Sequence, residues 1–298
     1  MTTRRFRQSE IKTFKTCPRQ WWLQYQRGLQ RKAVEGEKVS KASIGTLYHK
    51  ALEIYYLHGE AEALEEVGSG RPWSTGDAEQ DKSLNLVQRM VEGYIDWLKE
   101  TGADANWYVE GCEVQLEVPW PDLIAGDEVI LTGRIDMQVT DILAGGTKIV
   151  DNKSVMSFDQ ADLLYLNDQG RTYSWMMREL GLPVSGFIHN QARRVLRSKT
   201  ATPPFYNRVE VNYSDKLLNM HAIHLQSTLR QMVEAAQKLE KDSNDRGWGV
   251  LHHRYTVPNP SNDCSWRCDF VHVCPMFDDG SDAEGWLAEF TEARENGG

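Results

Sequence analysis

The first hundred residues carry apolar side chains at the spacing of amphipathic helices. Leu84, Val87, Val91 and Leu98, for example, recur at intervals that place them on one helix face. Three helices are predicted: from a cap at Ser9 to about Tyr25, over residues 44–58 from a cap at Ser43, and over about residues 80–100. The glycine-containing stretch 68–76 is predicted to be a loop.

From about residue 108 the apolar positions alternate with a period of two, which indicates half-buried strands. Strands are predicted over Tyr108–Val118, Glu128–Val139, Lys148–Lys153, Val184–Asn190 and Tyr206–Val211, and helices over Asn167–Glu179, 214–241 and 283–294. This order predicts an α/β fold with a mixed central β-sheet flanked by helices. We expect one unit over 1–298, with a helical N-terminal part (1–107), a core (108–212), and a C-terminal helix and cysteine segment (213–298).

Composition indicates in which compartment of the cell the protein is expected. The chain has 298 residues and no run of eighteen apolar residues, so no membrane-spanning helix is expected. Residues 1–8 are arginine-rich and lack the apolar region of a secretory signal. An intracellular, cytoplasmic location is therefore expected, where clustered cysteines are more often metal ligands than disulfides.

The charge distribution favours a polyanionic partner more than the total charge does. The net charge is −9, but residues 1–50 hold twelve Lys or Arg and three Glu. A second basic cluster comprises Arg193, Arg194, Arg197 and Lys199. Such local basic surfaces attract nucleic acid. Arg19 and the three arginines are candidate DNA contacts, and Trp21, Trp22 and Tyr25 could either stack on bases or pack in the core.

A carboxylate–lysine pattern stands at the end of the third predicted strand. Asp151 and Lys153 are two positions apart, so both face the same side of that strand. Asp136 lies on the preceding strand, across a short turn, and can come beside Asp151. Two carboxylates on neighbouring strands form an oxygen site for Mg²⁺ or Mn²⁺, and the lysine can activate water or offset phosphoryl charge. The alternative is a solvated pair of charges at a strand end.

Four cysteines form a second candidate metal site. Cys264, Cys268 and Cys274 lie close together near the C-terminus, and Cys17 would supply a distant fourth ligand. Four thiolates suit either a tetrahedral Zn²⁺ or an iron–sulfur cluster, and the spacing does not separate them. Cys112 lies among apolar residues of a strand and is expected to be a core thiol.

The ordered motifs resemble the PD-(D/E)XK nuclease superfamily, in particular its RecB-like branch. The resemblance covers most of the chain, from Ser9 to Cys274. It is carried by Phe14-x-x-Cys17-Pro18-Arg19, Gly45-Thr46-Leu47-Tyr48-His49, Gly133-Arg134-Ile135-Asp136, Asp151-Asn152-Lys153 and Gln169-x-x-x-Tyr173. It implies a restriction-endonuclease-like core whose N- and C-terminal segments are joined by a metal cluster.

The resemblance also implies roles for individual residues. His49, Asp136, Asp151 and the main-chain carbonyl of Asn152 would hold the catalytic metal, and Lys153 would activate or orient the attacking water. Gln169 and Tyr173 would support the substrate phosphate. The four cysteines would hold a structural [4Fe–4S] cluster. Glu113, on the strand before Asp136, is a further candidate ligand.

The function expected from this resemblance is metal-dependent exonuclease action on DNA ends or single strands, in recombination, repair or phage replication. A CRISPR adaptation nuclease that trims spacer precursors and a non-catalytic, cluster-bearing DNA-binding subunit are the alternatives. The chain contains no G-x-x-x-x-G-K-[ST] sequence, so any ATP-driven unwinding would need a helicase or recombinase partner. A phage origin and an oligomeric state stay open.

Overall fold

A computed structural model describes residues 1–32, 41–70, 73, 75, 77–182, 184–197, 200–246 and 254–294, with only the backbone for 41–43 and 242–246. The chain divides into two compact units, each built from separate stretches of sequence. Unit 1 comprises Met1–Glu35, Pro119–Thr132 and Ala222–Gly298, and unit 2 comprises Gly36–Val118 and Gly133–His221. Each unit is described by itself.

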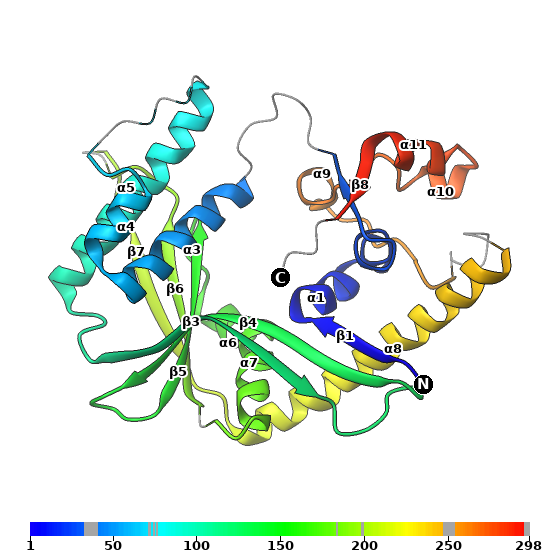
Figure 1. Ribbon diagram of the computed structural model, residues 1–298, viewed down its shortest axis with the longest axis horizontal. Helices are drawn as coiled ribbons and strands as arrows, with labels where there is room; N and C mark the ends of the chain where they lie inside the picture. The colour runs from blue at the N-terminus through cyan, green and yellow to red at the C-terminus, as the bar shows by residue number, and fades with distance from the viewer. Residues whose placement is uncertain are drawn as a thin grey trace. The chain divides into compact units, whose positions relative to one another are not determined.

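The main sheet is mixed, as the sequence predicts. Its strands are β1 (Thr3–Arg7), β3 (Trp107–Pro119), β4 (Glu128–Asp141), β5 (Thr147–Val155), β6 (Val184–Arg193) and β7 (Tyr206–Val211). The order is β1-β4-β5-β6-β7, and β3 also pairs with β4. β4 and β5 form an antiparallel hairpin, β5 and β6 are parallel, and β6 and β7 are antiparallel (Figure 1). The α/β fold with a mixed central sheet is therefore confirmed.

A helical crossover joins β5 to β6, because parallel neighbours cannot be linked by a tight turn. It contains α6 (Ala161–Tyr165) and α7 (Asp168–Glu179). The side chain of Asn167 accepts the backbone N–H groups of Gln169 and Gly170 and so caps α7 at its predicted start. This cap determines where the helix begins, and hence that Gln169 lies in its first turn.

The other helices of unit 2 supply an apolar core. They are α3 (Lys41–His58), α4 (Glu60–Glu66) and α5 (Ala78–Thr101). Tyr48, Leu52, Val91 and Tyr94 are fully buried in one cluster, which also includes Tyr206 of β7. Asp77 caps α5 and Gly102 ends it in the left-handed conformation. The predicted helical spacing in 80–100 thus corresponds to a buried face.

Unit 1 gathers segments from both ends of the chain. Its helices are α1 (Gln8–Thr16), α2 (Pro18–Trp21), the π-helix η1 (Trp22–Gln26), most of α8 (Asp215–Arg246), α9 (Cys264–Arg267), α10 (Met276–Asp279) and α11 (Ala283–Phe290). β2 (Leu29–Arg31) pairs antiparallel with β8 (Thr291–Ala293). β1 pairs in parallel with the first part of β4, from Thr3 opposite Glu128 to Arg7 opposite Thr132.

Several predicted boundaries need correction. The helix predicted from Ser9 to Tyr25 is broken at Cys17, which is extended with φ −156° and ψ 106°. Pro18 explains the break, because proline disfavours the helical conformation in the residue before it. Ser43 lies inside α3 rather than at its cap. The predicted helix over 283–294 ends at Phe290 and continues as β8.

The hydrophobic pattern did not predict the strands β1, β2 and β8 or the helix α4. Such short elements carry too few residues to show a period. Part of the predicted loop 68–76, and Lys199 of the predicted basic cluster, lie outside the described residues. Within the described part of the chain, no helix combines the length and the hydropathy that crossing a membrane requires.

Candidate active site

Asp136 lies where the pairing of β4 and β5 ends. The last register pair of the hairpin on this side joins Met137 to Val150, so Asp136 and Asp151 follow directly beyond it. Oδ2 of Asp136 accepts the backbone N–H of Asn152 at 2.7 Å. Nδ1 of His49, from α3, lies 3.4 Å from the same oxygen. The residues of three elements therefore meet at one carboxylate.

The His49–Asp136 pair shifts the pKa of both groups. Burial lowers the pKa of His49, but the hydrogen bond and the charge of Asp136 outweigh burial and raise it. Burial conversely raises the pKa of Asp136, and His49 and Lys153 outweigh it, so the net change is downward. Asp136 is thus held as a carboxylate, the form that binds a metal ion.

Asp151 is a buried carboxylate of the D-N-K sequence, with an exposed fraction of 3%. Its Oδ1 accepts hydrogen bonds from Nζ of Lys153 at 2.8 Å and from Nε2 of Gln169 at 3.0 Å. Burial raises the pKa of Asp151 despite the opposing charge of Lys153. Burial lowers the pKa of Lys153, but Asp151 and Asp136 outweigh it and the net change is upward. The lysine is therefore a cation between two carboxylates.

The predicted set converges in unit 2. His49, Asp136, Asp151 and Lys153 interact electrostatically with one another. Among the described residues, however, the group of possible ligands with the closest atoms contains the further candidate Glu113 and not Asp151. Ligand atoms of His49, Glu113 and Asp136 all lie within 4.8 Å of one another, whereas Asp151 is engaged by Lys153 and Gln169.

Glu113 reaches this group through an unusual backbone conformation. It has φ 52° in the middle of β3, and its side chain forms a 2.8 Å ion pair with Nε of Arg134. A positive φ is costly for a residue with a Cβ and changes the direction of the side chain. One imidazole and two carboxylates suit a divalent cation such as Mg²⁺ or Mn²⁺. Glu113, a further candidate by sequence, thus lies with His49 and Asp136, although alternation does not give its side-chain direction, because the local conformation departs from a regular strand.

Tyr173 and Gly133 connect two of the sequence motifs. Tyr173 is one turn after Gln169 on α7 and interacts electrostatically with Asp151 and Lys153. A Cβ added at Gly133 would lie only 2.7 Å from Cε1 of Tyr173. Glycine is therefore required at the start of the Gly133–Asp136 motif, because the tyrosine ring passes directly over the backbone.

Two buried polar residues of β6 extend the site, and the sequence analysis missed them. His189 is the register partner of Asp151, and Gln191 is the partner of Lys153. Nδ1 of His189 is 3.9 Å from Oδ2 of Asp151, and burial lowers the pKa of His189 to about 4. Gln191 donates to Oδ2 of Asp159 at 2.7 Å. Only the parallel register of β5 and β6, which no local pattern encodes, brings them here.

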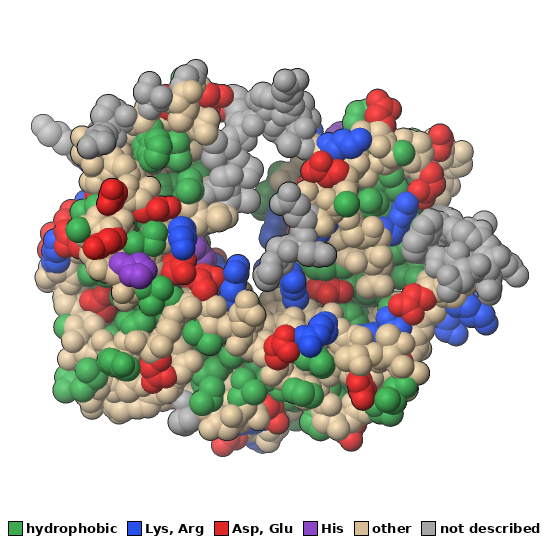
Figure 2. All heavy atoms as spheres, viewed as in Figure 1, with side chains coloured by type: hydrophobic (Ala, Val, Ile, Leu, Met, Phe, Trp, Pro, Cys, Tyr) green, Lys and Arg blue, Asp and Glu red, His purple; other side chains and the backbone are tan. Residues whose placement is uncertain are grey.

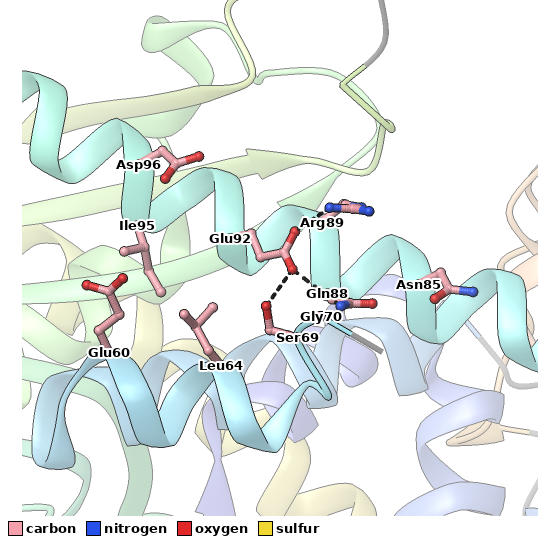
Figure 3. A pocket seen from close by; sticks show the side chains of 10 residues that line it. All are labelled: Glu60, Leu64, Ser69, Gly70, Asn85, Gln88, Arg89, Glu92, Ile95 and Asp96. Atoms are coloured by element: carbon pink, nitrogen blue, oxygen red, sulfur yellow. Dashed lines mark hydrogen bonds and ion pairs between the residues drawn. The ribbon is translucent and has the colours of Figure 1, made fainter. Parts of the chain in front are cut away.

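A separate cavity of about 530 Å³ lies between α4 and α5. Glu60, Glu92 and Asp96 line it, and Glu92 accepts hydrogen bonds from Ser69 and Gln88 (Figure 3). None of the residues around His49 and Asp151 lines this cavity. Its acidic lining is unfavourable for a phosphate backbone, so it is not a candidate substrate site.

The second basic cluster lies at the end of β6. Nε of Arg194 donates to Oγ of Ser154, the residue after Lys153, at 3.1 Å. Arg193 donates to two backbone carbonyls, and Arg197 forms a 3.0 Å ion pair with Asp96. On the face shown in Figure 2, acidic and basic side chains are interspersed. Arg194 is therefore an arginine of this cluster whose side chain hydrogen-bonds to the D-N-K strand.

Arg19 and Trp21 do not have the exposure that DNA contact requires. Arg19 is 2% exposed and Trp21 is fully buried. Arg19 donates to both carboxylate oxygens of Asp278, at 2.8 and 2.9 Å, and Nε1 of Trp21 donates to Glu10 at 2.9 Å. The prediction that they touch DNA is corrected: both side chains are buried inside unit 1, and each polar group has a hydrogen-bond partner there.

The four candidate cluster cysteines all lie in unit 1 and are unbridged and partly exposed. Burial raises the pKa of Cys268 to about 11, with further contributions from Cys17, Cys264 and Cys274, so the four sulfurs share one neighbourhood. Nη1 of Arg19 donates to the carbonyl of Cys274 at 2.8 Å and lies 3.7 Å from its Sγ. Arg19 thus connects the segment after Cys17 with the C-terminal cysteines.

The four thiolates suit either of two metal groups. They could bind a tetrahedral Zn²⁺ with Zn–S bonds of about 2.3 Å, or the corners of an iron–sulfur cluster. Both groups use the same donor set.

Comparison with known proteins agrees with this geometry. A family model of the PD-(D/E)XK nuclease superfamily matches residues 5–275. The chain belongs to this superfamily, and its class is therefore that of a nuclease. The match spans all of the sequence motifs from Cys17 to Cys274. A search of curated proteins gave no match.

Three solved structures are similar to this chain at low identity. A Eubacterium rectale protein described as a candidate exonuclease has 13% identity and a TM-score of 0.48, covering 87% of this chain and 91% of its own. SSO0001 has 14% identity and a TM-score of 0.35, with coverage of 78% and 84%. LHK-Exo, solved in complex with dAMP, has 13% identity and a TM-score of 0.28, with coverage of 69% and 98%.

Proposed function

We propose that this nuclease is a divalent-metal-dependent DNA exonuclease that acts on DNA ends or single strands. The observation that carries the proposal is the convergence of His49, Asp136, Asp151 and Lys153 at the open end of the β4–β5 hairpin. A nuclease site needs ligands for a hard cation and a fixed positive charge beside them, and this set contains both.

The proposed metal ligands are His49, Asp136, Asp151 and the main-chain carbonyl of Asn152, with Glu113 as a further candidate. A bound divalent cation supplies Lewis-acid polarisation of the phosphoryl group and lowers the pKa of water. Within the chain, Lys153 holds its proton at Nζ and can offset charge on a phosphate oxygen. Gln169 orients Asp151 through its 3.0 Å hydrogen bond, and Tyr173 supports the substrate phosphate.

The proposed DNA contacts are those of the second basic cluster. Arg194 is next to Ser154 at the end of the D-N-K strand, where a phosphate neighbouring the scissile one would pass. Arg193 and Arg197 lie beside it in the sequence. A role in recombination, repair or phage replication, with a helicase or recombinase partner, is proposed on the sequence resemblance alone.

A structural [4Fe–4S] cluster on Cys17, Cys264, Cys268 and Cys274 is the second part of the proposal, with Zn²⁺ as the alternative. Its support is the four-thiol donor set, in which Cys17, Cys264 and Cys274 all lie close enough to Cys268 to interact with it electrostatically. The visible absorption spectrum and the iron and zinc content of anaerobically purified protein distinguish the two metals. Zinc without iron would reject the cluster.

The test of catalysis is digestion of end-labelled linear DNA, single-stranded and duplex, with Mg²⁺ or Mn²⁺. Covalently closed circles serve as the substrate without ends. We expect linear DNA to be degraded, circles to survive, and Asp151→Ala and Lys153→Ala to abolish cutting while DNA binding persists. Asp122→Ala and Lys82→Ala, on exposed residues, are the matched controls. Cutting at the wild-type rate by either Asp151→Ala or Lys153→Ala would reject the proposed site.

A further inference from the structure

Beside the candidate active site, a row of polar side chains crosses three strands. Asn152 of β5 is the register partner of Asn190 of β6, which is in turn the partner of Arg208 of β7. Asn152 and Asn190 are 4% and 1% exposed. Successive residues of a strand point to opposite faces, so this row lies on the face away from Asp151 and Lys153. Buried polar side chains here require a reason, because apolar residues would pack at lower cost.

Hydrogen bonds connect the row from end to end. Nε of Arg208 donates to Oδ1 of Asn190 at 2.9 Å, and Nδ2 of Asn190 donates to Oδ1 of Asn152 at 2.7 Å. Nδ2 of Asn190 also donates to the hydroxyl of Tyr94 at 2.8 Å. The Asn190 amide is thereby held in one orientation, since both its oxygen and its nitrogen are engaged.

Arg208 is itself held rigidly. Its guanidinium donates to the carbonyl of Ala103 at 2.8 Å and to the hydroxyls of Tyr94 and Tyr56 at 2.6 and 3.1 Å. It also stacks over the ring of Trp107, with 4.2 Å from Cζ to the ring centroid. The planar guanidinium suits a site that requires several donors in fixed directions, which lysine cannot supply. The far end of the row is therefore a fixed anchor.

The near end of the row is the peptide that carries the metal ligands. Asn152 lies between Asp151 and Lys153, and its own N–H donates to Oδ2 of Asp136 at 2.7 Å. Rotation of the backbone at Asn152 would break the bond to Asp136 and turn the Asn152 carbonyl. The hydrogen bond from Asn190 to the Asn152 side chain opposes that rotation. An apolar residue at this position would fill space without fixing the direction of the peptide.

We propose that Arg208, acting through Asn190, is a positioning residue for the metal ligands. It holds the Asn152 peptide so that the N–H points at Asp136 and the carbonyl points to the metal position. This inference rests on the proposed function, because it assigns the row a role in metal binding. Neither Arg208 nor Asn190 touches substrate in this role; both act through Asn152.

The test is Asn190→Leu, which breaks the row at its middle. Mn²⁺ affinity is measured without DNA by electron paramagnetic resonance, together with the free energy of unfolding. We expect Mn²⁺ affinity to fall about 10-fold, within the range seen when groups that orient metal ligands are removed. The Mn²⁺ affinity of Arg208→Lys is expected to lie between those of the wild-type protein and Asn190→Leu. Asn85→Leu, in the same unit and lining the other cavity, is the matched control and should keep wild-type affinity.

A double variant separates positioning from ordinary stability. Asn152→Leu with Asn190→Leu removes both partners of a buried hydrogen bond, which is often nearly neutral for stability. We expect the double variant to regain stability relative to Asn190→Leu but not Mn²⁺ affinity. Recovery of stability and Mn²⁺ affinity together would overturn the proposal, because the row would then contribute only to packing. Unchanged Mn²⁺ affinity in folded Asn190→Leu would also overturn it.

A second measurement keeps this inference separable from the proposed function. Amide hydrogen exchange of the Asn152 N–H reports its bond to Asp136 without any metal. We expect faster exchange at Asn152 in Asn190→Leu, with Val150 of the same strand unchanged. Failure of the wild-type protein to bind Mn²⁺ would reject the proposed function, whereas unchanged exchange at Asn152 would overturn the positioning role whatever the metal result.

Discussion

Gln169 donates a 3.0 Å hydrogen bond to the same carboxylate oxygen of Asp151 that accepts from Lys153. The two residues are eighteen positions apart, on α7 and β5, and the Asn167 cap places Gln169 in the first helical turn. The position at which α7 begins therefore determines how the Asp151 carboxylate on β5 is oriented. The same geometry makes several consequences measurable.

Replacing Gln169 by leucine removes one of the two donors to Asp151. We expect the rate of DNA digestion to fall about 10–100-fold, because a ligand that has lost its orienting partner samples unproductive rotamers. Initial rates on end-labelled DNA measure this, with Gln160→Leu, on an exposed residue, as the control. Equal rates for both variants would remove Gln169 from the site.

Gly133→Ala should displace Tyr173, because the added Cβ would lie 2.7 Å from its ring. We expect digestion to slow by about 10-fold or more while the fold persists, since displacements near 1 Å cost rates of this order. Gly45→Ala is the matched comparison: its Cβ would meet Oγ of Ser154 at an ordinary 3.6 Å and should be tolerated. A crystal structure of Gly133→Ala with an unmoved Tyr173 would contradict the argument.

Stability should depend on pH through Glu10, a buried carboxyl in unit 1. Burial raises its pKa from 4.5 to about 7, although the hydrogen bond from Trp21 opposes this. A carboxyl whose pKa is higher in the folded state stabilises the fold below pH 4.5, and that contribution is lost as pH rises toward 7. The difference corresponds to at most about 3 kcal/mol.

Glu10→Gln tests this directly, because glutamine keeps an oxygen acceptor for Trp21 and cannot ionise. We expect the variant to unfold at a higher temperature than wild type at pH 8, and the difference to shrink as pH falls to 4.5. Thermal melts at several pH values measure it. A constant difference across that range would show that Glu10 does not titrate as described.

Cys268→Ala should remove the proposed cluster, since three thiolates leave one corner without a ligand. We expect loss of bound iron and visible absorbance, and a fall in melting temperature of about 10 °C, because a long closed loop in the unfolded chain is released. Metal analysis and thermal melts measure both. Cys112→Ala, in unit 2 and outside the four-sulfur group, should keep the iron. Wild-type iron content in Cys268→Ala would refute the assignment.

Burial decided the roles that local patterns left open. Trp21 and Arg19 are candidate DNA contacts by sequence, since a basic aromatic segment is typical of both a binding surface and a packed helix. The structure resolves this, because Trp21 and Arg19 are themselves buried and donate hydrogen bonds to Glu10 and Asp278 within unit 1. Arg194 is also a candidate DNA contact by sequence, because it lies in a basic cluster. In the structure it is partly exposed beside Ser154.

The sequence by itself determined the order of the main elements and the approach of Asp136 to Asp151. Both depend on short-range rules: alternation in strands, caps at helix starts, and a short turn between two neighbouring strands. The break at Cys17 is equally local, since Pro18 disfavours the helical conformation in the residue before it.

Only the tertiary structure decided which other residues reach the site. Glu113 arrives through a positive φ, His189 through the parallel register of β5 and β6, and Arg208 through a row that crosses three strands. Each depends on contacts between segments far apart in the chain. Periodicity records which face of one element is buried, but not which residue of another element lies opposite.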